Sequence, residues 1–296
     1  GSPPCEDYKR NGGEGIGGTS VMQEFKPSVS INDFERDEQC LGRGSHGKVY
    51  AVRYRKEKEF KYVMKIVKFS RENTKLIAMK EVNLMKYLNH ENLMTIKHCF
   101  VHEEKLVMIM DRMAMTGYDL IHSEVLYDNV QLVCYLLLVA RGIRFLHRNS
   151  LIHRDIKPLN ILVNLSNQNF ENGDVPRAVK DVRVADFGLS KFVLEEKMHQ
   201  TLGVGTLCYM APEIRLSSIY DNKVDSYSFG VMLAETATRK SPSRSTYTRD
   251  LFEATGKEFL YDLHCHCTAQ NPADRPTFDE ITRELEILLV YANSKV

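Results

Sequence analysis

Residues 153–160, HRDIKPLN, gather polar side chains between the apolar runs SLI and ILV. Asp155, Lys157 and Asn160 supply a carboxylate, an ammonium and an amide within six positions. A nearly all-apolar helical pattern precedes this stretch and another apolar run follows it. We therefore expect a loop held on a rigid scaffold, where catalytic side chains are often found.

A further carboxylate, Asp186 of VADFGLSK, follows a strand-like run. Oxygen ligands from Asn160 and Asp186 would suit a hard ion such as magnesium bound together with phosphates. Asp155 would then act on a hydroxyl, while Lys157 neutralises a moving phosphoryl group. This combination predicts phosphoryl transfer.

Three glycines, Gly42, Gly44 and Gly47, lie between two strand-like runs in CLGRGSHGKVYAVRY. Residues without a Cβ let backbone N–H groups approach phosphate oxygens closely. The alternative is an ordinary glycine-rich hairpin turn. No Lys-Ser/Thr pair ends the loop and no helix opens there, so nucleotide sites that need those features fit poorly.

A lysine and a glutamate come next. Lys65 lies in the strand-like run KYVMKIVKF, and a helical pattern follows over residues 74–90. Glu81 falls on the apolar face of that helix, between Ile77 and Leu84. A carboxylate in an apolar stripe needs a cation, and Lys65 is the candidate, although a lone strand lysine usually faces solvent.

The elements that position these residues change along the chain. Residues 1–30 are rich in Gly, Pro and Ser, which predicts a flexible tail. Short alternating strands with one helix are expected over 34–110, and long helices from 119 onward. Residues 165–180 are polar and contain glycine, so we expect a mobile surface excursion.

Composition excludes some partners. The 40 basic and 39 acidic residues nearly cancel, so no field of one sign favours nucleic acid or an anionic membrane. The uncharged run over 129–140 is too short to span a bilayer. Seven scattered cysteines indicate a reduced, cytoplasmic protein. The cluster LHCHC at 263–267 is read as helix cysteines, with a metal site as the alternative.

Taken together, five ordered motifs resemble the signature set of eukaryotic protein kinases: the glycine loop, Lys65 with Glu81, HRDIKPLN, DFG at 186–188 and APE at 211–213. The resemblance covers about residues 34–290. It implies the bilobal α+β protein-kinase fold, with a small β-rich N-lobe containing one helix (31–112) and a larger, mostly helical C-lobe (113–296). It also implies ATP and Mg²⁺ as cofactors.

The same resemblance implies a role for each site residue. Asp155 would be the catalytic base and Lys157 would contact the γ-phosphate, while Asn160 and Asp186 would bind magnesium. Lys65 would hold the α- and β-phosphates and pair with Glu81. The residues implied to contact or organise the nucleotide, with Met110 as gatekeeper, are Leu41, Gly42, Gly44, Gly47, Val49, Val63, Lys65, Glu81, Met110, Asp111, Met113 and Leu162.

Three further residues are implied to be structural. Glu213 should pair with Arg275 of NPADRPTF. Asp225 of DSYSFG should brace the catalytic loop from a buried helix.

KPLN resembles serine/threonine kinases, and GVGTLCYMAPE and DSYSFGVMLAE resemble their tyrosine-kinase-like group. The expected function is therefore a protein serine/threonine kinase acting on protein substrates. A pseudokinase scaffold and a tyrosine or dual-specificity kinase are the alternatives.

An upstream kinase, or the chain itself, is expected to phosphorylate Thr201, whose phosphate would pair with Arg154. The alternative is that Thr201 is merely an exposed threonine.

Overall fold

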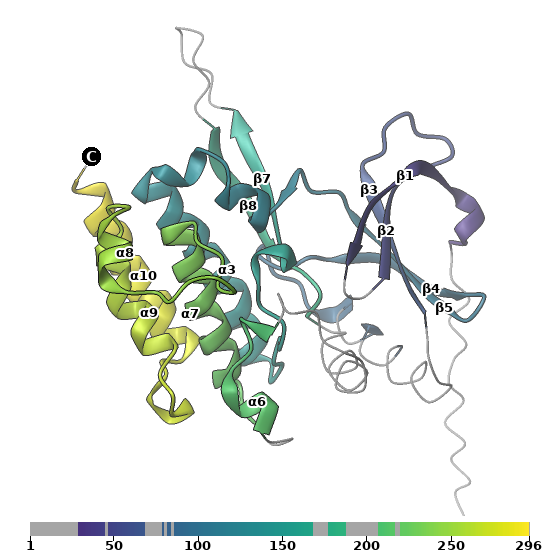
Figure 1. The fold of residues 1–296 in the computed structure, drawn as a ribbon. Coiled ribbons are helices and arrows are strands. Elements are labelled where there is room, and N and C mark those ends of the chain that lie inside the picture. Colours follow the sequence, from purple (N-terminus) through teal and green to yellow (C-terminus); the bar gives the residue numbers. More distant parts are fainter. Residues whose placement is uncertain are drawn as a thin grey trace, which may run out of the picture.

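A computed structural model describes residues 29–44, 47–68, 79, 82–83, 86–167, 177–187, 207–216 and 220–295 of the 296-residue chain. A strand-rich part lies on one side of the molecule and a mainly helical part on the other (Figure 1). The expected change from strands to helices along the chain is thus confirmed.

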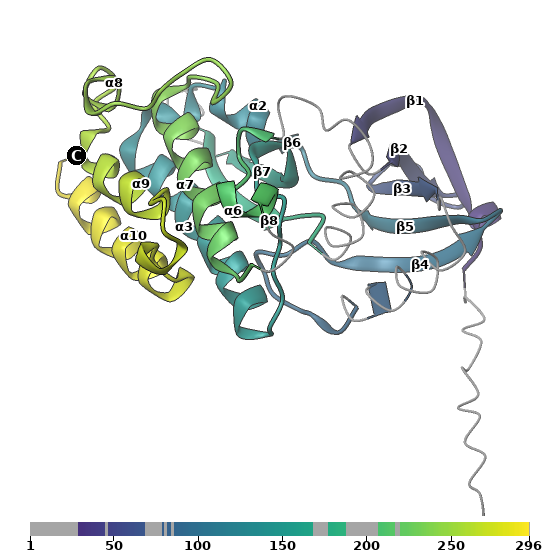
Figure 2. The ribbon, with the colours of Figure 1, turned by 60° about the horizontal axis from the view of Figure 1, so that its bottom comes forward.

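The strand-rich part is an antiparallel five-stranded sheet of order β1-β2-β3-β5-β4, seen edge to edge in Figure 2. Its strands are β1 (Phe34–Gly44), β2 (Gly47–Tyr54), β3 (Tyr62–Lys68), β4 (Ile96–His102) and β5 (Lys105–Asp111). Side chains alternate between its faces. Val52, Met64 and Ile109 share one face and form a small core there. Lys65 follows Met64 and therefore belongs to the opposite face.

The helix predicted over residues 74–90 lies partly within the described chain. Residues 79, 82–83 and 86–87 are helical, and Val82 is fully buried in the larger of the cores. Ile77, Glu81 and Leu84 lie outside the described residues, so the predicted pairing of Glu81 with Lys65 stays a prediction.

Helices fill the second part of the chain. The α-helices are α2 (Gly117–Ile121), α3 (Asn129–Arg148), α6 (Pro212–Leu216), α7 (Lys223–Thr238), α8 (Arg249–Glu253), α9 (Tyr261–Cys267) and α10 (Phe278–Asn293). Short 3₁₀ helices are η1 (Ile31–Asp33), η2 (Val125–Tyr127), η3 (Pro158–Asn160), η4 (Glu258–Leu260) and η5 (Pro272–Asp274). Helices α2, α3, α7, α8, α9 and α10 contribute buried residues to the larger core, whereas Ile31 of η1 packs on the small core of the sheet.

Helix α3 begins at a side-chain cap, because the Asp128 carboxylate accepts hydrogen bonds from the N–H groups of Val130 and Gln131. The helix is long and apolar enough to cross a membrane by length and composition, and it is the one such helix in the described ranges. However, 56% of its most apolar window is buried inside the protein, as expected for a core helix.

Helix α7 is buried almost throughout, although it contains several hydroxyl side chains. Ser228, Thr236 and Thr238 each donate a hydrogen bond to the carbonyl four residues earlier. Their hydroxyls therefore have partners inside an apolar environment, which removes most of the cost of burying them.

A second, three-stranded sheet of order β6-β7-β8 joins the two parts; its strands are β6 (Met115–Thr116), β7 (Ile161–Asn167) and β8 (Arg177–Val184). Strands β7 and β8 form the hairpin that projects from the molecule in Figure 1.

The prediction of a mobile excursion over 165–180 is wrong at both ends of that range. Leu165 and Val179 pack against the larger core, and the Val179 N–H donates to Oε1 of Gln131 at 2.9 Å. Residues 168–176 lie outside the described chain.

Candidate active site

The loop between α3 and β7 brings the predicted catalytic side chains together. Nζ of Lys157 lies 3.3 Å from Oδ2 of Asp155. Nδ2 of Asn160 donates to the Asp155 carbonyl at 2.7 Å and to its Oδ2 at 3.1 Å. The Asp155 carboxylate is therefore fixed by two neighbours, and its orientation is set before any substrate arrives.

Asp225, at the start of α7, holds this loop from beneath, as predicted. Its carboxylate is fully buried and accepts the N–H groups of His153 and Arg154, each at 2.8 Å. Nε2 of His147 donates to the same carboxylate at 2.7 Å. Burial would raise the pKa of Asp225, but the hydrogen bond and positive charge of His147 outweigh it and hold the pKa below its ordinary value.

His153 ties the catalytic loop to the segment that carries Asp186. Its Nδ1 accepts the Asp155 N–H at 3.1 Å, and its Nε2 lies 2.7 Å from the Ala185 carbonyl. Since a backbone N–H can only donate, Nδ1 is the acceptor and Nε2 must carry the proton. The buried ring thus couples the position of Asp155 to that of Asp186.

Arg154 and Asp186 both adopt left-handed backbone conformations, with φ values of +69° and +62°. Such values cost about 1–3 kcal/mol for residues other than glycine and cluster at functional sites. Here the surrounding hydrogen bonds, including the bond from the Arg154 N–H to Asp225, hold the strained backbone in place.

Lys65 reaches from the five-stranded sheet to this loop region. Its Nζ lies 2.5 Å from Oδ1 of Asp186, and both side chains are largely buried. Phe187, the next residue, is buried in the larger core. Lys65 therefore has a carboxylate partner in Asp186, while its predicted pairing with Glu81 stays a prediction.

Strand register explains which other predicted residues accompany Lys65. Directly paired residues of neighbouring strands share a face, and Lys65 pairs with Val49 on β2 and with Met108 on β5. Val63 pairs with Met110 and lies on the same face, two residues along. Val49, Val63 and Met110, three of the residues expected to contact or organise the nucleotide, thus lie on the same face of the sheet as Lys65.

The glycine loop connects β1 and β2. Gly42 pairs with Val49, and Gly44 pairs with Gly47 at the tip, whose residues 45–46 lie outside the described chain. Gly47 has φ +141°, and a Cβ there would lie 2.2 Å from the Ile66 carbonyl oxygen, so only glycine fits. Leu41 is exposed beside this turn.

The segment between β5 and β6 contains the predicted hinge residues Asp111 and Met113. The Arg112 N–H donates to the carbonyl of Lys61, the residue just before β3. Within the described chain, Met113 makes no hydrogen bond to another backbone group. Leu162 lies on β7, where it pairs with Thr116 of β6.

The donor set fits the expected metal and nucleotide. Asn160 uses its Nδ2 to bind Asp155, so its Oδ1 is the atom that can ligate a cation. Asp186 supplies carboxylate oxygens. No group of three or more His, Cys, Asp or Glu side chains that could hold a metal occurs in the described part of the chain. Two protein oxygens completed by phosphates and water are a usual arrangement for Mg²⁺.

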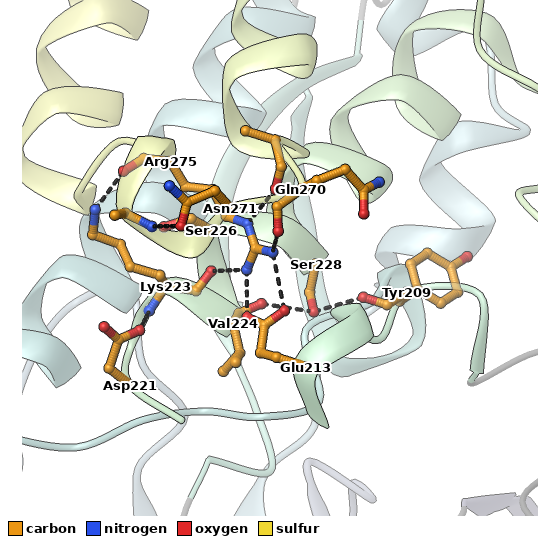
Figure 3. Close-up of polar contacts among 12 residues, drawn as sticks. Tyr209, Glu213, Asp221, Lys223, Val224, Ser226, Ser228, Gln270, Asn271 and Arg275 are labelled. Carbon is orange, nitrogen blue, oxygen red and sulfur yellow. Dashed lines mark hydrogen bonds and ion pairs between the residues drawn. The ribbon is translucent and has the colours of Figure 1, made fainter. Parts of the chain in front are cut away.

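Glu213 and Arg275 form the predicted structural ion pair (Figure 3). Arg275 is 1% exposed and donates to both carboxylate oxygens, at 2.5 and 3.0 Å. Its remaining donors bind the carbonyls of Ala269, Gln270 and Lys223. Burial alone would raise the pKa of Glu213, but the Arg275 guanidinium lowers it.

Sequence reasoning missed two residues near the site. His147, in the last turn of α3, shows no pattern that marks it as a partner of Asp225. Glu235 accepts a hydrogen bond from the Tyr209 hydroxyl in the segment before APE. Burial raises the pKa of Glu235. A carboxyl inside the apolar run FGVMLAETA was a usable signal, of the kind that singled out Glu81.

Comparison with known proteins gives one family. The protein kinase domain family matches residues 35–289. Aurora kinase of Saccharomyces cerevisiae is 31% identical over 233 residues, covering 75% of this chain and 57% of the relative. Serine/threonine-protein kinase ULK1 of Homo sapiens is 29% identical over 241 residues, covering 80% of this chain and 22% of the relative. Dual specificity protein kinase shkB of Dictyostelium discoideum is 31% identical over 278 residues, covering 86% of this chain and 40% of the relative. The chain thus spans 22–57% of the length of these relatives.

Proposed function

This chain belongs to the protein kinase family, and from that premise we propose that it transfers the γ-phosphate of ATP to serine and threonine hydroxyls of protein substrates. The observation that carries the proposal is the geometry around Asp155, whose carboxylate is held by Asn160 and faces Lys157. The names of relatives such as the ULK1 serine/threonine-protein kinase favour the same acceptor class.

The chain's residues divide the work as follows. Asp155 orients the substrate hydroxyl and accepts its proton while the oxygen bonds to the γ-phosphorus and the bond to the bridging oxygen breaks. Lys157, beside it, neutralises charge on the moving phosphoryl group. Lys65 holds the nucleotide phosphates, and Asn160 and Asp186 hold the metal. Bound Mg²⁺ supplies charge stabilisation that the protein side chains alone would not.

The test is phosphoryl transfer to a mixed peptide library. The purified protein is incubated with Mg²⁺ and γ-labelled ATP, and the labelled amino acids are identified. We expect phosphoserine and phosphothreonine. Label confined to phosphotyrosine would replace the proposal with a tyrosine kinase. Nucleotide binding without transfer to any peptide or to the chain itself would indicate a pseudokinase scaffold.

We further propose that the chain belongs to the tyrosine-kinase-like group and acts in the cytoplasm. The first proposal rests on GVGTLCYMAPE and DSYSFGVMLAE, and the second on the scattered cysteines. Aurora, ULK1 and shkB relatives do not single out this group. A phylogeny of kinase domains would test the group, and imaging of the full-length protein in cells would test the compartment.

Regulation by phosphorylation of Thr201 is also proposed; Thr201 itself lies outside the described residues. Arg154 supports the proposal, because its Nε is buried with no hydrogen-bond partner within the described chain. Its guanidinium also lies 5.8 Å from the Tyr220 ring centroid and donates to the Ile152 carbonyl. A phosphate would supply the missing acceptor and charge.

Mass spectrometry after incubation with ATP, together with rates for Thr201→Ala, tests this regulation. We expect phosphate on Thr201 and a slower variant. Full activity of the wild-type protein with Thr201 unmodified would overturn the proposal.

A further inference from the structure

Asn164 of β7 contacts the segment that passes between the two parts of the molecule. Its Oδ1 accepts the Ala114 N–H at 2.8 Å, and its Nδ2 lies 3.3 Å from Sδ of Met113. Because a backbone N–H can only donate, the first contact fixes which atom of the amide is oxygen. The sequence shows Asn164 only as part of NLS, a glycosylation pattern with no role in phosphoryl transfer.

The Asn164 contact lies on a stretch of chain between two anchored segments. Arg112 binds the carbonyls of Phe60 and Lys61, in the segment that leads directly into β3. Strand pairing with β7 begins only at Met115, which lies opposite Val163. Residues 113–114 fall between these two anchors, outside both sheets. Within the described chain, the Asn164 side chain is their hydrogen-bonding link to β7.

We infer that Asn164 is a positioning residue for nucleotide binding. It holds the Ala114 N–H and the Met113 side chain, and thereby the Met113 backbone that the kinase resemblance places against the adenine ring. The strand that carries Asn164 follows directly on Asn160, at the end of the catalytic loop. Asn164 thus orders the segment expected to meet the adenine and does not touch the catalytic groups. This inference rests on the proposed ATP-dependent function.

The alternative is that Asn164 only stabilises the fold. A positioning role alters the affinity of the folded protein for the adenine part of the nucleotide. A stabilising role instead lowers the melting temperature and leaves the affinity of the folded fraction unchanged.

The test compares Asn164→Leu, Asn164→Asp and Ser166→Ala with the wild type. Leucine keeps the approximate shape and removes both polar contacts. Aspartate keeps an acceptor for Ala114 but lies across from Asp181, so it should cost stability. Ser166→Ala is the matched control, because Ser166 lies on the same strand and, among the described residues, its hydroxyl donates to the Ala178 carbonyl of the hairpin alone.

For Asn164→Leu we expect KM for ATP, and the inhibition constant of adenosine, to rise about three- to tenfold, as loss of one hydrogen bond would give. The kcat at saturating ATP should remain within about twofold, since the catalytic groups are untouched. Asn164→Asp should keep near-wild-type affinity for ATP and adenosine despite its lower stability. Ser166→Ala should change neither the affinity nor the stability.

Unchanged affinity in Asn164→Leu, or a loss that aspartate does not restore, would overturn the inference. Failure of the proposed function looks different. In that case the wild-type protein itself would not bind adenosine or transfer phosphate.

Discussion

At the scale of single residues, the site depends on groups that never touch the substrate. Asp225 binds two backbone N–H groups of the catalytic loop and the ring of His147. His153 then links that loop to Ala185. The orientation of Asp155 is therefore a property of a buried hydrogen-bond network, which constrains it more tightly than a surface loop could.

Asp225→Asn should destabilise the protein by about 3–5 kcal/mol. The amide nitrogen would face one of the groups that now donate to the carboxylate, and the site would still be buried from water. The pKa of Asp225 is lowered in the folded state, so its stabilisation is present above the unfolded pKa, about 3.9, and is lost as pH falls through the folded value. Urea unfolding at a series of pH values measures both effects. The variant's deficit should shrink as pH falls below about 4, and a deficit independent of pH would contradict this assignment.

Some of these residues could be predicted from the sequence and others could not. The pairing of Glu213 with Arg275 was predictable only through the resemblance to protein kinases, because the local sequence around either residue does not identify its partner. The left-handed φ of Asp186 has no sequence signal, since a non-glycine residue there is held by its surroundings. The contacts of Asn164 were likewise unpredictable, because any strand asparagine has the same sequence pattern.

At the scale of elements, α7 and α9 approach closely at Gly230. A Cβ at this position would lie 2.5 Å from the Cβ of Cys267 and 2.9 Å from Cγ2 of Thr268. Nδ1 of His264, on α9, also donates a hydrogen bond to the Gly230 carbonyl at 2.9 Å. The glycine therefore sets the distance between the two helices.

Gly230→Ala should cost about 1–3 kcal/mol, because a methyl group must force the helices apart. Gly42→Ala is the control for stability, since a Cβ there meets no atom within 4 Å. Chemical denaturation of the two variants gives the comparison. Equal stability of both would show that α9 can shift without penalty.

The β7–β8 hairpin separates into a packed base and residues 168–176. Replacing 168–176 with a short glycine-containing turn should leave the melting temperature and the phosphotransfer rate nearly unchanged. Val179→Ala should lower stability by about 0.5–1.5 kcal/mol, because it removes side-chain contacts with the larger core. If the shortened protein is insoluble, residues 168–176 contribute to the fold after all.

At the scale of the whole molecule, the active site is assembled from distant parts of the chain. Lys65 and Asp186 are 121 positions apart, yet their charged atoms are 2.5 Å apart. Local periodicity predicted a strand-rich part and a helical part, because alternation and helical spacing are local signals. It could not give the strand order or the face shared by Val49, Val63 and Lys65, which depend on pairing between distant segments.

The most direct test of the account is phosphotransfer by Asp155→Asn. Asparagine can still accept the hydrogen bond from Asn160, so the loop should keep its shape, but it cannot take the hydroxyl proton. We predict that transfer of labelled phosphate from ATP to peptide falls by about 10²- to 10⁴-fold, while fluorescent-nucleotide affinity stays within about threefold. Lys65→Met should lose transfer as well, through misplaced phosphates. If purified Asp155→Asn protein transfers phosphate as fast as the wild type, the catalytic role assigned to this carboxylate is wrong.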